Sequence, residues 1–125
     1  MTIETIKDVS EGTFVSDVIE KSKEKIMIVD FWAPWCGPCK ALTPILERQA
    51  FKKKEQIEVV KVNIDENQAI ASQLRIQSIP AVFAFSDGQP VDGFMGAKSE
   101  PEVEKFFEAL VSKFSKKIVS GLEEI

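Results

Sequence analysis

Residues 29–40 read VDFWAPWCGPCK, and the fold of the chain can be worked out from this stretch. It continues an apolar run, Ile26 to Phe31, which is interrupted only by Asp30 and is typical of a strand buried on both faces. Two prolines and a glycine follow, and they predict a turn or the entry to a helix. Apolar residues then recur at helical spacing from Cys39 to Phe51. The stretch therefore predicts a strand, a tight connection and a helix.

Outward from this stretch, predicted strands and helices alternate. Patterns of β-branched and apolar residues predict strands at 2–9, 26–31, 57–64, 81–85 and 91–95, and helical periodicity predicts helices at 14–19, 39–51, 66–74 and 100–114. Ser99 and Glu102 form a capping box for the last helix. Strands that alternate with helices form a parallel core, and the final hairpin adds an antiparallel edge. We expect an α/β fold with a central mixed β-sheet of four to five strands, flanked by helices on both faces.

The chain has 125 residues, which is enough for one domain that buries a core without disulfide staples or a metal. We expect that domain over residues 1–112. Residues 113–125 extend the apolar stripe of the last helix, but charged residues and Gly121 dilute it. This C-terminal helix extension is either a fraying helix end or a linker that leads into a further domain.

The composition argues against several classes of function. Lys and Arg number 16 and Asp and Glu number 20, and the resulting net charge of −4 does not favour binding to nucleic acid. No apolar run approaches the roughly 20 residues of a membrane span. The N-terminus lacks the apolar segment of a secretory signal, so we expect a cytoplasmic protein, although a mature chain that has lost its signal would look similar. Histidine is absent, which removes the usual base of serine and cysteine nucleophiles.

Cys36 and Cys39 are the two cysteines of the chain. Cysteines at i and i+3 that follow a strand and open a helix form a redox motif, because their sulfurs can close and reopen a small disulfide ring. The helix N-terminus favours an anion, so we expect a lowered pKa for Cys36, whose thiolate attacks a partner disulfide before Cys39 resolves the mixed disulfide. Two other interpretations stay open: half of a zinc site, for which no further cysteine or histidine exists, and a pair of unreactive thiols.

Residues 29–40 resemble the active-site segment of the thioredoxin family nearly residue for residue. The resemblance continues through residues 61–65, Ile79-Pro80 and Gly96-Ala97, and it covers about residues 5–112. It implies a thioredoxin fold and a protein-disulfide reductase that cycles between a Cys36–Cys39 disulfide and the dithiol. It also implies disulfide-bearing client proteins and recycling by a flavin-dependent thioredoxin reductase. We expect no metal and no cofactor bound to the chain itself, which has no nucleotide-binding glycine motif.

The family resemblance also assigns roles beyond the cysteines. Asp30 resembles a buried aspartate that accepts the proton of the second cysteine, and Lys61 resembles its partner. The residues alone also fit an Asp30 that faces water at a strand end and an exposed Lys61. Pro80 resembles a cis-proline that faces the disulfide, although most X-Pro bonds are trans. The apolar docking surface for a client peptide is expected to contain Trp35, Gly37, Pro38, Ile79, Pro80, Gly96 and Ala97.

A finer resemblance concerns residues 87–94, which read DGQPVDGF. They look like the corresponding hairpin in the thioredoxin domain of chaperedoxins, co-chaperones that carry tetratricopeptide repeats after that domain. Two further functions therefore stand beside a disulfide reductase. One is a co-chaperone domain that binds unfolded or oxidised clients and works with chaperones, and the other is a folding oxidase or isomerase in an exported compartment. The Gly37-Pro38 spacer resembles that of the reductants in the family. We expect the chain to act as a monomer.

Overall fold

The computed structural model describes residues 6–115 of the chain. Its elements, in chain order, are β1 (Lys7–Asp8), η1 (Val15–Glu20), η2 (Lys21–Lys23), β2 (Ile26–Trp32), α1 (Gly37–Lys52), β3 (Ile57–Asn63), α2 (Gln68–Gln73), β4 (Ala81–Ser86), β5 (Gln89–Met95) and α3 (Glu100–Phe114). The η1 segment is π-helical, and η2 is a short 3-10 helix. Within the described residues the strands form a five-stranded sheet in the order β1-β3-β2-β4-β5.

The central strand of this sheet is β2. It runs parallel to β3, where Asp30 lies opposite Lys61, and antiparallel to β4, where Asp30 lies opposite Val82. Every residue of β2 except Trp32 is buried. A strand that is paired on both edges and covered on both faces is apolar along most of its length, which explains the run of apolar residues that Asp30 interrupts.

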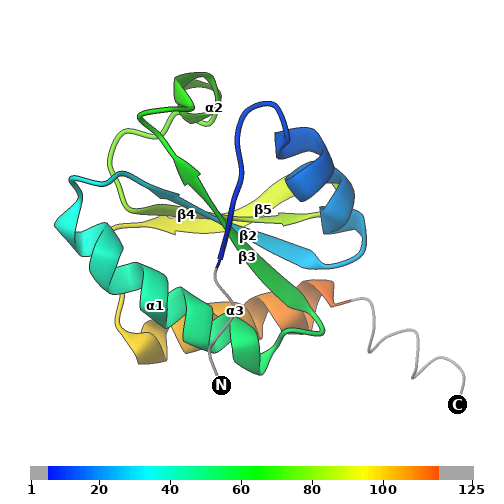
Figure 1. The fold of residues 1–125 in the computed structure, drawn as a ribbon. Coiled ribbons are helices and arrows are strands. Elements are labelled where there is room, and N and C mark those ends of the chain that lie inside the picture. The colour runs from blue at the N-terminus through cyan, green and yellow to red at the C-terminus, as the bar shows by residue number, and fades with distance from the viewer. Residues whose placement is uncertain (1–5, 116–125) are drawn as a thin grey trace, which may run out of the picture.

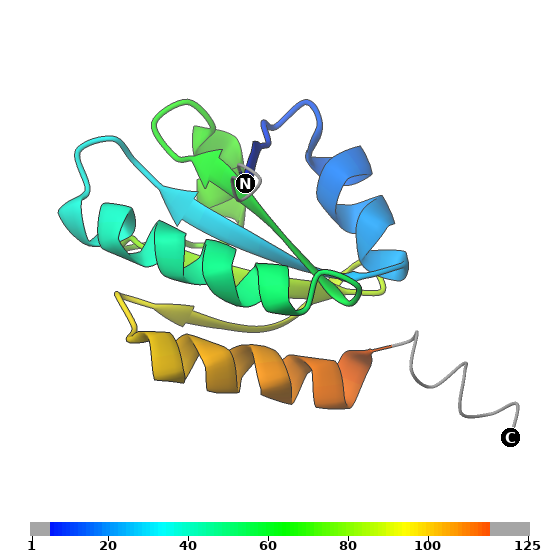
Figure 2. The ribbon, with the colours of Figure 1, turned by 60° about the horizontal axis from the view of Figure 1, so that its bottom comes forward.

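The two faces of the sheet carry separate hydrophobic cores. Ile26 and Ile28 belong to the core that α1 and α3 cover, whereas Met27 and Val29 belong to the core beneath η1 and α2. Figures 1 and 2 show this arrangement, with α1 and α3 together on one side of the sheet. Successive side chains of a strand point to opposite faces, so Asp30 lies on the same face as Ile26 and Ile28. The alternation therefore buries a carboxyl group beneath α1.

The structure confirms the predicted α/β fold with a mixed sheet and helices on both faces. The predicted capping box is also confirmed, because the Ser99 hydroxyl accepts from the Glu102 N–H and the Glu102 carboxylate accepts from the Ser99 N–H. The first strand is shorter than predicted within the described residues, where only Lys7–Asp8 pair with β3.

The start of α1 differs from the prediction, whereas α3 has the predicted bounds. α1 begins at Gly37 rather than at Cys39, because Cys36 occupies the position that caps the helix. α3 continues to Phe114, so the predicted domain boundary after residue 112 falls within its last turn. Residues 116–125, the greater part of the predicted extension, lie outside the described residues.

Candidate active site

The two cysteines lie at the N-terminus of α1 and form a disulfide, with their Cα atoms 5.3 Å apart. Cys36 caps the helix in an extended conformation, and its sulfur accepts a hydrogen bond from the Cys39 N–H at 3.2 Å. Pro38 has no N–H, so this amide is the first in the helix after that of Gly37. Cys36 is 4% exposed and Cys39 is 1% exposed. The first cysteine therefore lies at the helix end and the second within the first turn, and both are buried.

The connection between β2 and α1 carries an exposed tryptophan. Trp35 is 67% exposed, and its indole N–H donates to the Asp65 carboxylate at 3.0 Å from Oδ2 and 3.3 Å from Oδ1. Asp65 follows β3, which is the parallel neighbour of β2, so both connections leave the same end of the sheet. The hydrogen bond holds the edge of the indole beside the disulfide. Asp65 was not among the predicted site residues.

Asp30 is completely buried on β2 and is held by a residue of α1. The Thr43 hydroxyl donates to Asp30 Oδ2 at 2.8 Å, and it also lies 3.0 Å from the Cys39 carbonyl oxygen. Asp30 Oδ1 has no hydrogen-bond partner among the described residues. Burial raises the pKa of the Asp30 carboxyl to about 6, against the opposing effects of the Thr43 hydrogen bond and the charge of Lys61. The alternative of a strand-end aspartate in water is therefore wrong.

Lys61 lies opposite Asp30 on the neighbouring strand, on the same face of the sheet. It is partly buried, and its ammonium group lies 5.1 Å from the centre of the Trp32 ring, a cation–π contact. Among the ion pairs of residues 6–115, none joins Lys61 to Asp30 directly. Its positive charge nevertheless lowers the pKa of Asp30. Lys61 thus acts on the carboxyl group through its field, and the interpretation as a merely exposed lysine is wrong.

The loop before β4 forms the other side of the site. The Ile79-Pro80 bond is cis, as the resemblance implied, and the Pro80 carbonyl accepts from the Gly96 N–H at 2.8 Å. Side chains that pack against the buried cluster of Ala33, Cys36 and Cys39 are Trp32, Ile64 and Ile79. Gly37, Pro38 and Ala97 are exposed, the first two directly beside the cysteines. The predicted docking residues from three separate segments thus meet at the end of the sheet where β2 leads into α1.

A groove of about 310 Å³ runs beside the disulfide, between Trp35 and the loop before β4. Its lining includes Trp35 and Ile79, which were predicted, and four residues that were not: Ile64, Ile76, Gln77 and Ser78. Met95 is 51% exposed, and its sulfur lies 3.6 Å from the Ser78 hydroxyl. These residues extend the predicted docking surface. Their types carry no chemical signal in the sequence, so only the path of the loop could reveal them.

Thr43 is a further site residue that was not predicted. The signal for it was present but ambiguous, because Thr43 lies four residues after Cys39 on a predicted helix and therefore faces the same way. A threonine at that position fits equally well as a residue that hydrogen-bonds its own helix. Only the packing of α1 on β2 shows that its hydroxyl reaches Asp30.

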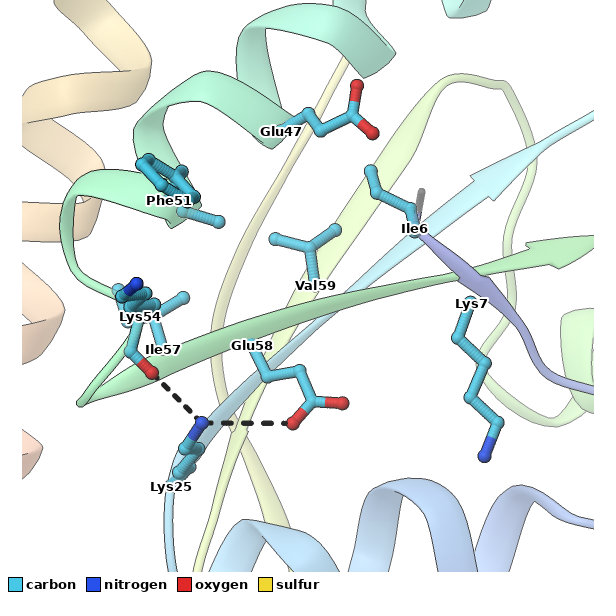
Figure 3. A pocket seen from close by; sticks show the side chains of 10 residues that line it. Ile6, Lys7, Lys25, Glu47, Phe51, Lys54, Ile57, Glu58 and Val59 are labelled. Atoms are coloured by element: carbon cyan, nitrogen blue, oxygen red, sulfur yellow. Dashed lines mark hydrogen bonds and ion pairs between the residues drawn. The ribbon is translucent and has the colours of Figure 1, made fainter. Parts of the chain in front are cut away.

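A second groove, of about 340 Å³, lies at the opposite end of α1 (Figure 3). Phe51 and Val59 line it, and Lys25 donates to the Lys54 carbonyl at 2.9 Å and pairs with Glu58 at 4.0 Å. None of the ten residues that line this groove belongs to the predicted site. Over residues 6–115 no three Cys, His, Asp or Glu side chains gather where they could hold a metal ion. In the same part of the chain, no helix is both long and apolar enough to span a membrane.

The fold and the site define a class of protein. In this class, two cysteines at the start of a helix, beside a buried carboxyl group, alternate between a dithiol and a disulfide. The family model for thioredoxin matches residues 5–109. The chain is 48% identical over 89 residues to Thioredoxin 1 of Synechococcus elongatus, and the aligned region covers 71% of this chain and 81% of that protein. It is 43% identical over 96 residues to Thioredoxin of Mycobacterium tuberculosis strain H37Rv, and the aligned region covers 77% of this chain and 80% of that protein.

A further relative is the Bifunctional thioredoxin reductase/thioredoxin of Mycobacterium leprae. It is 41% identical over 93 residues, which is 74% of this chain and 20% of that protein. The chain belongs to the thioredoxin family. With its Cys36–Cys39 pair it is a thiol–disulfide oxidoreductase that reduces protein disulfides, which confirms the redox interpretation of the two cysteines.

Proposed function

We propose that Cys36 is the attacking sulfur of this reductase and Cys39 the resolving sulfur. The Cys36 thiolate attacks one sulfur of a client disulfide, so that a Cys36–client disulfide forms and the other client sulfur leaves as a thiolate and takes a proton from water. Cys39 then loses its proton and attacks the Cys36 sulfur, which closes the Cys36–Cys39 disulfide and releases the second client sulfur. The client disulfide gains two electrons, and the dithiol loses two.

The observation that carries this assignment is the hydrogen bond from the Cys39 N–H to the Cys36 sulfur at the N-terminus of α1. Unpaired amides and the helix dipole stabilise negative charge at this position, so reduction of the disulfide leaves the first sulfur as the better thiolate. Cys39 lies within the first turn and is 1% exposed, against 4% for Cys36, so Cys36 is the slightly more accessible of the two residues.

Asp30 is the proton acceptor for Cys39 in this proposal. Its carboxyl group is buried on the face of the sheet that α1 covers, and Thr43 connects it to the turn that holds Cys39. With its pKa raised to about 6 by burial, the carboxyl group is ionised near neutral pH yet binds a proton far better than an ordinary aspartate. Lys61 keeps the carboxylate charged, and water can carry the proton between the two groups.

The client binds at the groove beside the disulfide. Trp35, Ile76 and Ile79 present apolar surface there, and Gly37, Pro38, Gly96 and Ala97 leave room for an extended chain next to Cys36. The cis-proline residue Pro80 lies buried behind Ile79 and accepts from Gly96, so it belongs to the frame of the groove. The backbone of Ile79 offers hydrogen bonds to a client peptide in this arrangement.

The oxidised chain needs a source of two electrons, and we propose a thioredoxin reductase as that partner. The Mycobacterium leprae relative supports this, because its name joins a thioredoxin reductase and a thioredoxin in one protein. We also propose that the chain is a monomer and that it acts in the cytoplasm. Both proposals rest on the composition of the chain and on its self-contained site.

Reduction of insulin disulfides in the presence of NADPH and a thioredoxin reductase tests the assignment. Cys36→Ser is expected to abolish turnover, because it removes the attacking thiolate. Cys39→Ser is expected to stop after the first step and to accumulate a Cys36–insulin disulfide, which mass spectrometry under non-reducing conditions detects. Turnover by Cys36→Ser at the rate of the unmodified chain would overturn the assignment, and so would trapping through Cys39 in that variant.

A second candidate is a domain of a chaperedoxin-like co-chaperone, and residues 87–94 are the feature that favours it. They form the turn between β4 and β5 and most of β5, and Ser86 pairs with Gln89 across this turn. The relatives reported above are thioredoxins, and they favour the reductase. The double variant Cys36→Ser/Cys39→Ser separates the two functions, because a co-chaperone suppresses aggregation of a chemically unfolded client without redox chemistry. Loss of suppression in that variant would remove this candidate.

A further inference from the structure

Thr43 occupies a position between the two groups that exchange a proton in the proposed mechanism. Its hydroxyl oxygen lies 2.8 Å from Asp30 Oδ2 and 3.0 Å from the carbonyl oxygen of Cys39. A hydroxyl group has one hydrogen to donate and two lone pairs that accept. Thr43 can therefore donate to Asp30 or to Cys39 at one time, but not to both.

The protonation state of Asp30 decides which of these bonds forms. An ionised carboxylate can only accept, so the Thr43 hydrogen must point at Asp30 Oδ2. A protonated carboxyl group carries its own hydrogen and can donate it to the Thr43 oxygen, which frees the Thr43 hydrogen for the Cys39 carbonyl. The carboxyl group thus keeps a hydrogen bond in both states. Since Oδ1 has no partner among the described residues, Thr43 supplies the hydrogen bond that holds this buried group.

The other charged and titratable groups around Asp30 are few. Lys61 on β3 is opposite in register, and Cys36 and Cys39 lie at the start of α1. β4, on the other edge of β2, contributes no titratable residue, because Ala81–Ser86 reads AVFAFS. α3 packs on the same core with apolar side chains such as Val103 and Phe107. The Thr43 hydrogen bond opposes the effect of burial on Asp30 more strongly than the charge of Lys61 does.

We propose that Thr43 is a positioning residue for thiol–disulfide exchange, whose hydroxyl turns between Asp30 and the Cys39 carbonyl as Asp30 takes up and releases the Cys39 proton. This proposal rests on the role of Asp30 stated under the proposed function. The proton balance is complete: Asp30 gains the hydrogen that Cys39 loses and then returns it to water, the departing client thiolate takes up a proton from water, and Thr43 only redirects its own hydrogen.

Thr43→Val tests the proposal, since it keeps the branched shape and removes the hydroxyl. In the oxidised protein the carboxyl carbon of Asp30, followed by NMR, is expected to titrate about one pH unit higher in this variant, because the hydrogen bond lost by the ionised carboxylate is stronger than the one lost by the neutral carboxyl group. Closure of the Cys36–Cys39 disulfide, followed by acid quench and mass spectrometry in single turnovers, is expected to be about tenfold slower at a pH below both midpoints. The midpoint of the pH profile of this closure rate is expected to shift to higher pH by the same amount as the titration midpoint of Asp30.

Three further variants sharpen this test. Thr43→Ser restores the hydroxyl and is expected to return both the titration and the pH profile. Thr43→Ala removes the hydroxyl with less bulk and replaces Thr43→Val if that variant does not fold. Thr13→Val makes the same chemical change in the turn before η1 and is expected to leave both readouts where they were.

The two proposals fail in different ways. If Thr43→Val leaves the Asp30 titration unchanged, or if Thr43→Ser does not restore it, the role of Thr43 is wrong while that of Asp30 can stand. If Asp30→Asn leaves the rate and pH profile of disulfide closure unchanged, the role of Asp30 as proton acceptor is wrong, and with it the function assigned to Thr43. A shifted titration with an unshifted closure profile in Thr43→Val also overturns the role of Thr43 in exchange.

Discussion

Asp30 lies beneath α1 with no exposed surface, and burial holds the pKa of its carboxyl at about 6 in the folded chain, against an ordinary value of 3.8. The folded state therefore binds this proton more tightly than the unfolded state does. Below pH 3.8 both states are protonated, so the contribution of Asp30 is fully favourable there. As the pH rises toward 6 the unfolded state ionises first, and the free energy of unfolding falls by about 3 kcal/mol in all.

Asp30→Asn is expected to remove this pH dependence, because an amide does not ionise. Above pH 6 the variant should be more stable than the unmodified chain by up to about 3 kcal/mol, and below about pH 4 the two should be similar. Urea unfolding at a series of pH values between 3 and 8 measures the difference. A difference in the free energy of unfolding that stays constant across this range would contradict the burial of an ionisable carboxyl group.

Some residues of the site could be predicted from the sequence and others could not. Cys36 and Cys39 were predicted because two sulfurs at this spacing have few other uses, whereas the role of Asp30 was predicted from its resemblance to the buried aspartate of the thioredoxin family. Thr43 and Asp65 were not predicted, since a hydroxyl on a helix and an acidic residue after a strand are common everywhere. Their roles depend on the partners that the fold brings to them.

At the scale of elements, α3 is the helix whose start depends most on local sequence. The Ser99 hydroxyl accepts from the Glu102 N–H at 3.3 Å and completes a capping box. Ser99→Ala is expected to lower the free energy of unfolding by about 1 kcal/mol, because it leaves an amide of the first turn without its partner. Ser112→Ala, on an exposed position of the same helix, is the matched control and should change little. Equal effects of the two variants in urea unfolding would show that the cap contributes nothing.

The start of α2, in contrast, depends on a distant segment. The helix covers Gln68–Gln73 rather than the predicted 66–74, and the Glu11 carboxylate accepts from the Ala69 N–H at 2.7 Å. The Asn67 side chain in turn accepts from the Glu11 N–H at 2.9 Å. Periodicity predicted that a helix exists here, but its first turn is completed by a residue 58 positions earlier. Element boundaries of this kind cannot be read from a local pattern.

At the scale of the whole molecule, part of the apolar core lies away from the dithiol. Leu110 of α3 is 1% exposed in the core between the sheet and the two long helices, whereas the dithiol lies at the end of the sheet. Leu110→Ala is expected to lower the free energy of unfolding by about 2–5 kcal/mol, because it removes buried methyl groups and leaves a cavity. The insulin-reduction rate per folded molecule should remain that of the unmodified chain.

Val15→Ala is the control for this prediction, because Val15 is 62% exposed and its truncation should cost less than about 0.5 kcal/mol. Urea unfolding and an activity assay at a temperature where each variant is folded make the comparison. A fall in the rate per folded molecule of Leu110→Ala would show that α3 packing and the dithiol are coupled.

Local sequence patterns were sufficient to predict which segments form strands and helices along the chain. They were also sufficient to predict the redox chemistry of Cys36 and Cys39. Hydrophobic periodicity and the spacing of two sulfurs are properties of neighbouring residues, so they survive without a fold. Only the tertiary structure showed the spatial order of the strands within the sheet, the groove beside Trp35 and the contact of Thr43 with Asp30. These features join residues far apart along the chain, and the register of the sheet and the packing of α1 on β2 select which of them meet.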